Sequence, residues 1–148
     1  MGYTMETDPE VTSKAYGKEI HISPKKSVEV CNFLRGKDVD AALNILDEVI
    51  EKKRAVPYRR HNKQVSHNKG VGSGGYPVNV AKKIKYLIEE AQSNAEDKGL
   101  DAEDMCILSL CAHRGRVVKG YRSRAFGRSS PFNRSTTNIE VILEKKED

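Results

Sequence analysis

Residues 105–143 read MCILSLCAHRGRVVKGYRSRAFGRSSPFNRSTTNIEVIL, and they decide the fold. An apolar run begins this stretch at residues 105–111 and another ends it at residues 139–143. Each run has the length and composition of a buried strand. Residues 112–138 between them are too polar to build a core. The pattern predicts a β-hairpin whose two strands continue beyond the body, each by about 13 residues or roughly 40 Å.

The connection between the two strands is strongly basic. Residues 113–134 contain seven Lys and Arg residues and no acid. A two-stranded ribbon is marginally stable by itself in water, and like charges repel one another. The ribbon therefore needs a second surface of opposite charge. Its arginines are Arg114, Arg116, Arg122, Arg124, Arg128 and Arg134.

The preceding residues predict one more strand and three helices in a single domain. Alternation over Lys18–Ile22 indicates a short strand that follows an irregular arm at residues 1–18. Ser23-Pro24 is a helix start and Gly36 is a helix stop. Apolar stripes at helical spacing indicate helices at residues 24–35, 38–54 and 77–98. The link at residues 56–76 is long for a compact domain, and such links are usually functional or disordered.

Charge is segregated along the chain. The 148 residues carry a net charge of +5, but residues 51–70 and 113–134 contribute +6 and +7, which leaves −8 on the rest. A basic surface on an acidic body is typical of a protein that binds a polyanion, either nucleic acid or an anionic membrane. No run of 18 apolar residues is present, and the acidic residues 1–11 do not resemble a signal peptide. We therefore expect a cytoplasmic protein with no membrane partner.

Signals for enzymatic chemistry are weak. Gly70–Gly75 precedes a helix and resembles a phosphate-binding loop, but it lacks the Gly-Lys-Ser/Thr ending. The cysteines form no C-x-x-C pair, and the histidines of the loops lie in basic surroundings, so we expect neither metal nor cofactor. The cysteines are instead expected to be small core residues: Cys31, Cys106 and Cys111.

Arginine-rich segments with aromatic residues favour RNA as the polyanion. Arg makes bidentate contacts to phosphate, and Tyr121, Phe126 and Phe132 could stack on bases. A flexible, solvated loop is the alternative interpretation of the same composition. A second basic block begins at a helix C-terminus, where cations are favourable in any case. That effect does not explain the cations of the following loop: Arg59, Arg60, Lys63 and Lys69.

Several segments together resemble the L-twenty-two family of large-subunit ribosomal proteins, in its archaeal form. The resemblance covers roughly residues 11–147. Its most specific part is Arg124-Ala125-x-Gly127-Arg128, followed by a Thr-rich turn and Ile139-x-Val141. The segments are ISPKKSVEVCNFLRGKDVDAALNIL (22–46), KKRAVPYRRHNK (52–63), GGYPVNVAKKI (74–84), NAEDKGLD (94–101) and AHRGRVVKGYRSRAFGRSSPFNRSTTNIEVILEKKE (112–147).

This resemblance implies an α+β fold in which three helices pack on a small antiparallel three-stranded sheet that carries a long extended β-hairpin. It implies a non-catalytic, cofactor-free protein of the cytoplasmic ribosome that binds large-subunit rRNA, aids assembly, and contacts neighbouring large-subunit proteins. The hairpin tip would line the nascent-peptide tunnel and meet the nascent polypeptide. The expected parts are an N-terminal arm at 1–18, a globular body at 19–111 and 138–148 with a basic loop at 55–76, and a hairpin arm at 112–137.

The resemblance also implies which residues face RNA and which form the tip. The rRNA-binding residues would be Lys25, Lys26, Lys52, Lys53, Arg54, Tyr58, Arg59, Arg60, His61, Asn62, Lys63, Lys69, His113, Arg114, Arg116, Lys119, Tyr121, Arg122, Arg124, Arg128 and Arg134. The tunnel tip would be Lys119, Gly120, Tyr121, Arg122, Ser123, Arg124, Ala125, Phe126 and Gly127.

Two other functions fit parts of the sequence. A free RNA- or DNA-binding module acting outside the ribosome shares all the electrostatics, and it would form a stable complex with a short isolated RNA. A small phosphate-ester enzyme using the glycine loop would show turnover that depends on Gly74 and Lys82. No base, nucleophile or metal set in the sequence supports the enzyme.

Overall fold

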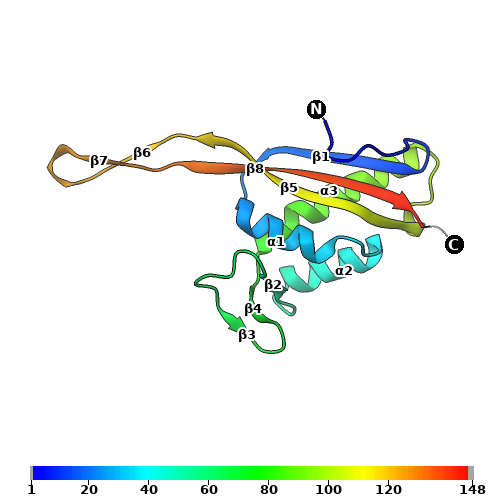
Figure 1. Ribbon diagram of the computed structural model, residues 1–148, viewed down its shortest axis with the longest axis horizontal. Coiled ribbons are helices and arrows are strands. Elements are labelled where there is room, and N and C mark those ends of the chain that lie inside the picture. The colour runs from blue at the N-terminus through cyan, green and yellow to red at the C-terminus, as the bar shows by residue number, and fades with distance from the viewer. Residues whose placement is uncertain (1, 147–148) are drawn as a thin grey trace.

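The computed structural model describes residues 2–146, which form a body with a long projecting hairpin (Figure 1). The body contains a three-stranded antiparallel sheet in the order β1-β8-β5. Its strands are β1 (Thr12–Ile20), β5 (Met105–Val118) and β8 (Arg134–Lys145), and its helices are α1 (Pro24–Leu34), α2 (Val39–Ile50) and α3 (Val78–Asp97). The prediction of an α+β fold with three helices on a small antiparallel sheet is confirmed.

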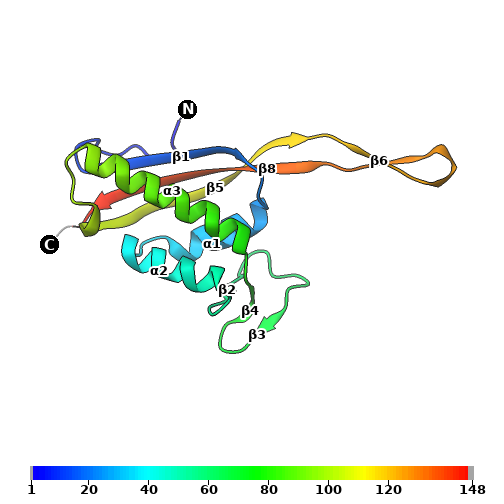
Figure 2. The ribbon, with the colours of Figure 1, turned by 180° about the vertical axis from the view of Figure 1, so that it is seen from behind.

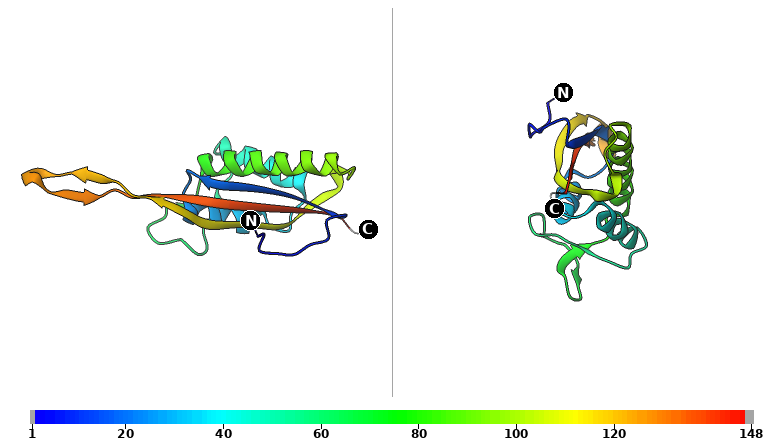
Figure 3. Two further views of the ribbon diagram at one scale, coloured as in Figure 1. Left: turned by 90° about the horizontal axis from the view of Figure 1, so that it is seen from above. Right: turned by 90° about the vertical axis from the view of Figure 1, so that its right-hand side faces the viewer.

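The helices cover one face of the sheet, and the N-terminal segment runs along the other face (Figures 2 and 3). Strand β8 lies in the middle and alternates between the two faces. Ile139, Val141 and Leu143 are fully buried in the core that the helices share. Glu140 and Ile142 point the other way, and both are also buried. The central strand is therefore covered on both sides, which fits its nearly continuous apolar run.

The helix boundaries follow local chemistry. Pro24 occupies the first position of α1, where its missing N–H costs nothing. Gly36 and Gly99 follow α1 and α3 with φ angles of 76° each, a conformation that favours glycine. Helix α2 ends at Ile50, four residues before the predicted end, because Lys52 adopts a left-handed conformation with φ of 61°.

Strand β1 begins six residues earlier than the sequence pattern indicated. We expected residues 1–18 to be irregular, but residues 12–17 pair with β8. The β1 residues that face α3 are small: Ser13 donates to the Ala91 carbonyl, Ala15 is buried and Gly17 lies against Leu87. No apolar alternation therefore marks this part of the strand, and a register shift follows it between Gly17 and Ile20. Gly17 allows β1 to lie close to α3, because an added Cβ would lie 2.5 Å from an Ile20 methyl and 2.8 Å from a Leu87 methyl, and both side chains would have to shift.

The buried stripe of α2 sits at the centre of the hydrophobic core. Leu46 is fully buried together with Ala42 and Val49, and these residues pack with α3. Burying such a side chain stabilises the fold by about 1.5–3 kcal/mol.

The three cysteines were all expected to be core residues. Cys31 is in the core, whereas Cys106 and Cys111 are only half-buried. The expectation is therefore correct for Cys31 alone.

Leu46→Asp should unfold the body, because it replaces a buried apolar side chain with an unpaired charge, at a cost above about 4 kcal/mol. The far-ultraviolet circular dichroism signal and the cooperative thermal transition should both be lost. Asn44→Asp is the matched control, since it adds the same charge to an exposed position of α2. A folded Leu46→Asp protein with an unchanged melting temperature would contradict the assignment of this stripe to the core.

Candidate nucleic-acid interface

The projecting hairpin, which we call the arm (residues 112–137), is a direct continuation of the body's sheet. Strands β5 and β8 remain paired from Met105 opposite Lys145 to Val118 opposite Arg134. The ladder resumes between β6 (Tyr121–Ser123) and β7 (Ser129–Pro131). The Phe132 N–H donates to the Gly120 carbonyl at 2.6 Å between the two stretches. The long hairpin predicted from the two apolar runs is therefore present.

Glycines and a bulge shape the arm near its root. The register between β5 and β8 shifts between Arg114 and Val117, which increases the local twist. The Thr136 hydroxyl donates to the Arg116 carbonyl at 2.7 Å across this bulge. A Cβ at Gly115 would lie 2.6 Å from the Thr136 hydroxyl oxygen, so the two strands approach closely only because residue 115 has no side chain.

The turn of the arm comprises Arg124–Arg128. The Arg124 N–H donates to the Arg128 carbonyl at 2.8 Å and closes the turn. Phe126 has a left-handed backbone (φ 57°, ψ 37°), which is strained for a bulky residue, and its side chain is 95% exposed. The turn lies at the C-terminal end of the predicted tip; Tyr121–Ser123 form strand β6, which leads into it, and Lys119 and Gly120 link β5 to β6.

The cations of the arm have no acidic partners among the described residues. Six arginines and Lys119 are all exposed, and the arm contains no acid. Arg124 donates to the Ser130 hydroxyl at 3.0 Å, and Arg134 lies 5.6 Å from the centre of the Phe132 ring. None of the ion pairs within residues 2–146 involves an arm arginine. The guanidinium groups are thus available to phosphate.

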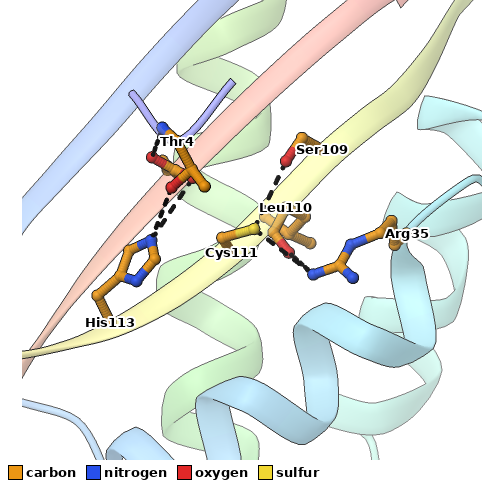
Figure 4. A network of polar contacts seen from close by, with 7 residues as sticks. Thr4, Arg35, Ser109, Leu110, Cys111 and His113 are labelled. Carbon is orange, nitrogen blue, oxygen red and sulfur yellow. Dashed lines mark hydrogen bonds and ion pairs between the residues drawn. The ribbon is translucent and has the colours of Figure 1, made fainter. Parts of the chain in front are cut away.

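A buried carboxylate fixes the N-terminal segment at the arm's root (Figure 4). Glu140 is 1% exposed, and its carboxylate accepts the Thr4 N–H at 3.1 Å. His113 Nε2 lies 3.5 Å from the other carboxylate oxygen and 3.3 Å from the Thr4 hydroxyl. Burial alone would raise the pKa of Glu140, but the hydrogen bonds from Thr4 and His113 hold that pKa below its usual value. His113, predicted to bind RNA, is therefore already engaged within the protein.

The opposite side of β5 is tied to the end of α1. Arg35 donates to the Leu110 carbonyl at 2.9 Å and lies 3.5 Å from the Cys111 sulfur (Figure 4). The turn after α1 adds two backbone bonds, from Gly36 N–H to the Ile107 carbonyl and from Ile107 N–H to the Lys37 carbonyl. These contacts hold the body end of β5 rigidly, and the arm is anchored through it.

The second basic element is the loop at residues 55–76, which is folded rather than disordered. Its short strands are β2 (Val56–Pro57), β3 (His67–Asn68) and β4 (Gly72–Gly75), and β4 pairs with both others. A Cβ at Gly74 would lie 2.5 Å from the Val56 carbonyl oxygen. The Gly74 N–H already donates to Ser66. These glycines therefore allow close strand packing, and they do not form a phosphate-binding loop.

Glu29 organises the start of this basic loop. Its carboxylate is 2% exposed and accepts the backbone N–H groups of Arg59, Arg60 and His61 at 2.9, 2.8 and 2.7 Å. Burial would raise the pKa of Glu29, but these three hydrogen bonds lower it. The side chains of Arg59 and Arg60 are exposed. Sequence reasoning missed Glu29, although it is the only acid between residues 20 and 37.

Tyr58 was predicted to contact RNA, and the structure does not support that role. Its side chain is 8% exposed and belongs to the hydrophobic core. Burial, followed by the charge of Glu29, raises the pKa of the Tyr58 hydroxyl. The alternation of Val56 and Tyr58 toward the core places this ring inside, so it cannot stack on a base.

The chain resembles known proteins over almost its whole length. The sequence profile of a family described as ribosomal protein L22p/L17e matches residues 15–144. The large ribosomal subunit protein uL22 of Methanococcoides burtonii is 47% identical over 144 residues, covering 97% of this chain and 95% of the relative. The uL22 proteins of Methanopyrus kandleri (46% identical, 95% and 91% covered) and Thermofilum pendens (40%, 98% and 97%) also match.

The chain belongs to this family. The resemblance found in the sequence is thereby confirmed, including its archaeal form. The uL22 family is structural and non-enzymatic, which removes the phosphate-ester enzyme from consideration. None of the described helices is long and apolar enough to cross a membrane. Within residues 2–146, no three His, Cys, Asp or Glu side chains gather in a way that could hold a metal ion.

The uL22 fold distributes the predicted RNA-binding residues over three places. The arm carries Arg114, Arg116, Lys119, Tyr121, Arg122, Arg124, Arg128 and Arg134; the basic loop carries Arg59, Arg60, His61, Asn62, Lys63 and Lys69; the body at the arm's root carries Lys25, Lys26, Lys52, Lys53 and Arg54. Lys53 pairs with Glu51, the residue that follows α2, and Arg54 pairs with Glu48 of α2. These two cations are therefore partly neutralised by their own helix end.

Glu29→Gln should loosen the basic loop, because an amide offers one acceptor oxygen and adds a donor that faces other donors. We expect the free energy of unfolding to fall by about 2–3 kcal/mol at pH 7. The amides of Arg59, Arg60 and His61 should exchange hydrogen faster. Glu48→Gln, which breaks only an exposed ion pair, is the control and should cost less than about 0.5 kcal/mol.

The Glu29 effect should depend on pH in a defined direction. The folded-state pKa of Glu29 is lowered, so its contribution is complete above the ordinary value of 4.5 and is lost as the pH falls through the lowered pKa. The stability difference between wild type and Glu29→Gln should therefore shrink below pH 4.5. A difference that stays constant down to pH 2 would contradict a charged Glu29 in the folded protein.

Proposed function

We propose that this protein, a structural constituent of the large ribosomal subunit, binds large-subunit rRNA through its arm and basic loop, and that the turn of the arm lines the nascent-peptide tunnel. The observation that carries this proposal is the arm itself. It is a two-stranded ribbon with exposed arginines on its length, no acid, and no core of its own. Such a ribbon gains its second surface only from a polyanion.

RNA provides the negatively charged surface against which the arm can lie. Arginine forks bind phosphate oxygens bidentately, and each phosphate neutralised releases counterions, which favours binding. The exposed rings of Tyr121, Phe126 and Phe132 offer stacking surfaces for unpaired bases. Because the arm projects beyond the body, its two ends reach RNA segments that are far apart (Figure 1). Binding such segments together is how the protein aids assembly of the subunit.

The body and the arm present surfaces of different chemistry. The C-terminal half of α3 carries Glu89, Glu90, Glu96 and Asp97 on its exposed side. This acidic surface repels RNA and is left to solvent or to neighbouring large-subunit proteins. The turn of the arm, at the far end, presents Phe126 without an intramolecular partner. That exposed ring is placed to meet the nascent polypeptide.

Replacing Arg124 and Arg128 with Glu should impair incorporation into the large subunit. The change removes two cations and adds two repelling charges at the turn. We expect at least a tenfold lower share of tagged protein to sediment with the large subunit in an RNase-sensitive manner. Lys37→Glu with Lys145→Glu changes the net charge equally, away from the arm, and is the control. Equal incorporation of both variants and wild type would count against the arm as an rRNA-binding element.

A photo-reactive side chain at the turn tests the tunnel assignment separately. Phe126→p-azidophenylalanine, in ribosomes that carry a stalled nascent chain, should cross-link to that chain. The same residue at Val118, which is 46% exposed in the middle of the arm, should cross-link to rRNA instead. If position 126 captured only rRNA or a neighbouring protein, the turn would not line the path of the nascent chain.

A further inference from the structure

The Thr-rich segment at residues 135–138 lies where the arm leaves the body. It is part of strand β8, at the level where the sheet narrows from three strands to two. Strand β1 ends at Ile20, which pairs with Thr137, and only β5 and β8 continue beyond it (Figures 1 and 3). None of residues 116–134 is buried, so the arm has no core that could hold its direction. A two-stranded ribbon is marginally stable and strongly twisted by itself, and its direction therefore depends on how its root is held.

Two interruptions of the β-ladder flank β8 at this level, and a β8 side chain closes each of them. On the β5 side the register shifts near Arg116, and the Thr136 hydroxyl donates to the Arg116 carbonyl at 2.7 Å. On the β1 side the register shifts near Glu19, whose N–H donates to the Asn138 side-chain oxygen at 2.7 Å. Bulges bend a strand and increase its twist. The two hydrogen bonds therefore hold the bent strands on either side of β8 in one arrangement.

Thr137 ties the same level of the sheet to the helical layer. Its hydroxyl donates at 2.9 Å to the carbonyl of Ile22, which lies in the link between β1 and α1. Thr137 is on the helix-covered face of β8, whereas Thr136 and Asn138 are on the other face, because side chains alternate along a strand. Thr136 and Thr137 are 2% and 0% exposed, so water does not compete for their hydroxyls. Threonine is also stiff at its first side-chain torsion, which keeps each hydroxyl in place.

We propose that Thr136, Thr137 and Asn138 are positioning residues that set the direction of the arm before it meets any partner. The three consecutive side chains act through three different segments: β5, the link before α1, and the bulged end of β1. Hydrogen bonds on both faces of one strand resist bending toward either face. Without them, two adjacent interruptions of the ladder would leave a hinge at this level.

A preset direction has a consequence for assembly, and this second part of the inference rests on the proposed function. An arm that already points one way loses less conformational entropy when it inserts into the subunit. Removing the three side-chain hydrogen bonds should therefore lower incorporation, although every cation of the arm stays in place.

The distance between the arm and the body in the free, full-length protein tests the direction of the arm. Nitroxide labels on p-acetylphenylalanine at Ser129 of the arm and Tyr86 of α3 leave the native thiols unmodified, and both positions are exposed. Double electron–electron resonance should give one narrow distance distribution for the otherwise wild-type protein. Thr137→Val with Asn138→Leu should broaden that distribution at least twofold, because two ties to the body are lost while the side chains keep about the same size.

Thr12→Val is the matched control. Thr12 is also a buried strand threonine, 1% exposed, and its hydroxyl donates to the Asp8 carbonyl. It lies at the opposite end of the same sheet, so its replacement should remove a similar hydrogen bond without broadening the distance distribution. Thr137→Ser with Asn138→Asp keeps a hydroxyl donor and an acceptor oxygen, and this conservative variant should retain the narrow distribution.

Three results would overturn the preset direction. They are a broad distribution in the wild-type protein, an unchanged distribution in a folded Thr137→Val, Asn138→Leu protein, and equal broadening by Thr12→Val. The last result would mean that a general loss of stability is the cause. If the double variant lacks the circular dichroism signal of a folded protein, Asn138→Leu alone, at a half-buried position, has to meet the same criterion.

Incorporation into the large subunit tests the second part of the inference. Tagged Thr137→Val, Asn138→Leu protein, in competition with wild type, should enter large subunits at least threefold less. Equal incorporation of a variant with a broadened distribution would overturn this part alone. If the wild-type protein does not enter large subunits at all, the proposed function itself fails, and the distance measurement still decides whether the direction of the arm is preset.

Discussion

The pairing of β5 with β8 begins inside the hydrophobic core and continues, through a bulge between Arg114 and Val117, into the arm. At the body end, Ile107 faces Leu143 across the ladder, and both side chains are fully buried. At the other end, Val118 faces Arg134, and both are exposed. A two-stranded ribbon of this length is marginal by itself, but here its first half is held by the helices, by β1 and by Arg35. The arm can therefore be long because its root is rigid.

Two buried carboxylates hold two further segments, the N-terminal segment and the basic loop, against the body. Glu140 holds Thr4 against the sheet, and Glu29 holds three consecutive N–H groups of the basic loop. Glu29 accepts three hydrogen bonds, and Glu140 accepts one from Thr4 and lies 3.5 Å from His113 Nε2; these contacts offset the cost of burying each charge. Glu29 has a further effect, since its negative charge sits beneath Arg59 and Arg60. It lowers the repulsion within the basic loop before any RNA is bound.

Much of the fold could be predicted because its signals are local. Pro24 and Gly36 mark helix ends by their backbone preferences, and the apolar runs at 105–111 and 139–143 mark strands by composition. Other features depend on contacts across the chain. The inward-facing residues of β1, such as Ser13 and Ala15, are too small to give an apolar alternation. A sequence shows that Glu29 is acidic without showing which N–H groups it faces. Tyr58 lies beside two arginines in the sequence, but it directly follows β2 and its ring is in the core, so its sequence neighbours wrongly indicated a role in RNA binding.

In the folded protein, the acidic and the basic residues lie on different parts of the surface. Exposed acids lie on the C-terminal half of α3, whereas exposed cations lie on the arm, the basic loop and the helix starts. Within the free protein this arrangement raises the electrostatic energy, because like charges are brought together. The core and the two buried carboxylates offset that energy with contacts that do not involve RNA. The cations are consequently in place before RNA arrives, and less ordering entropy has to be lost on binding.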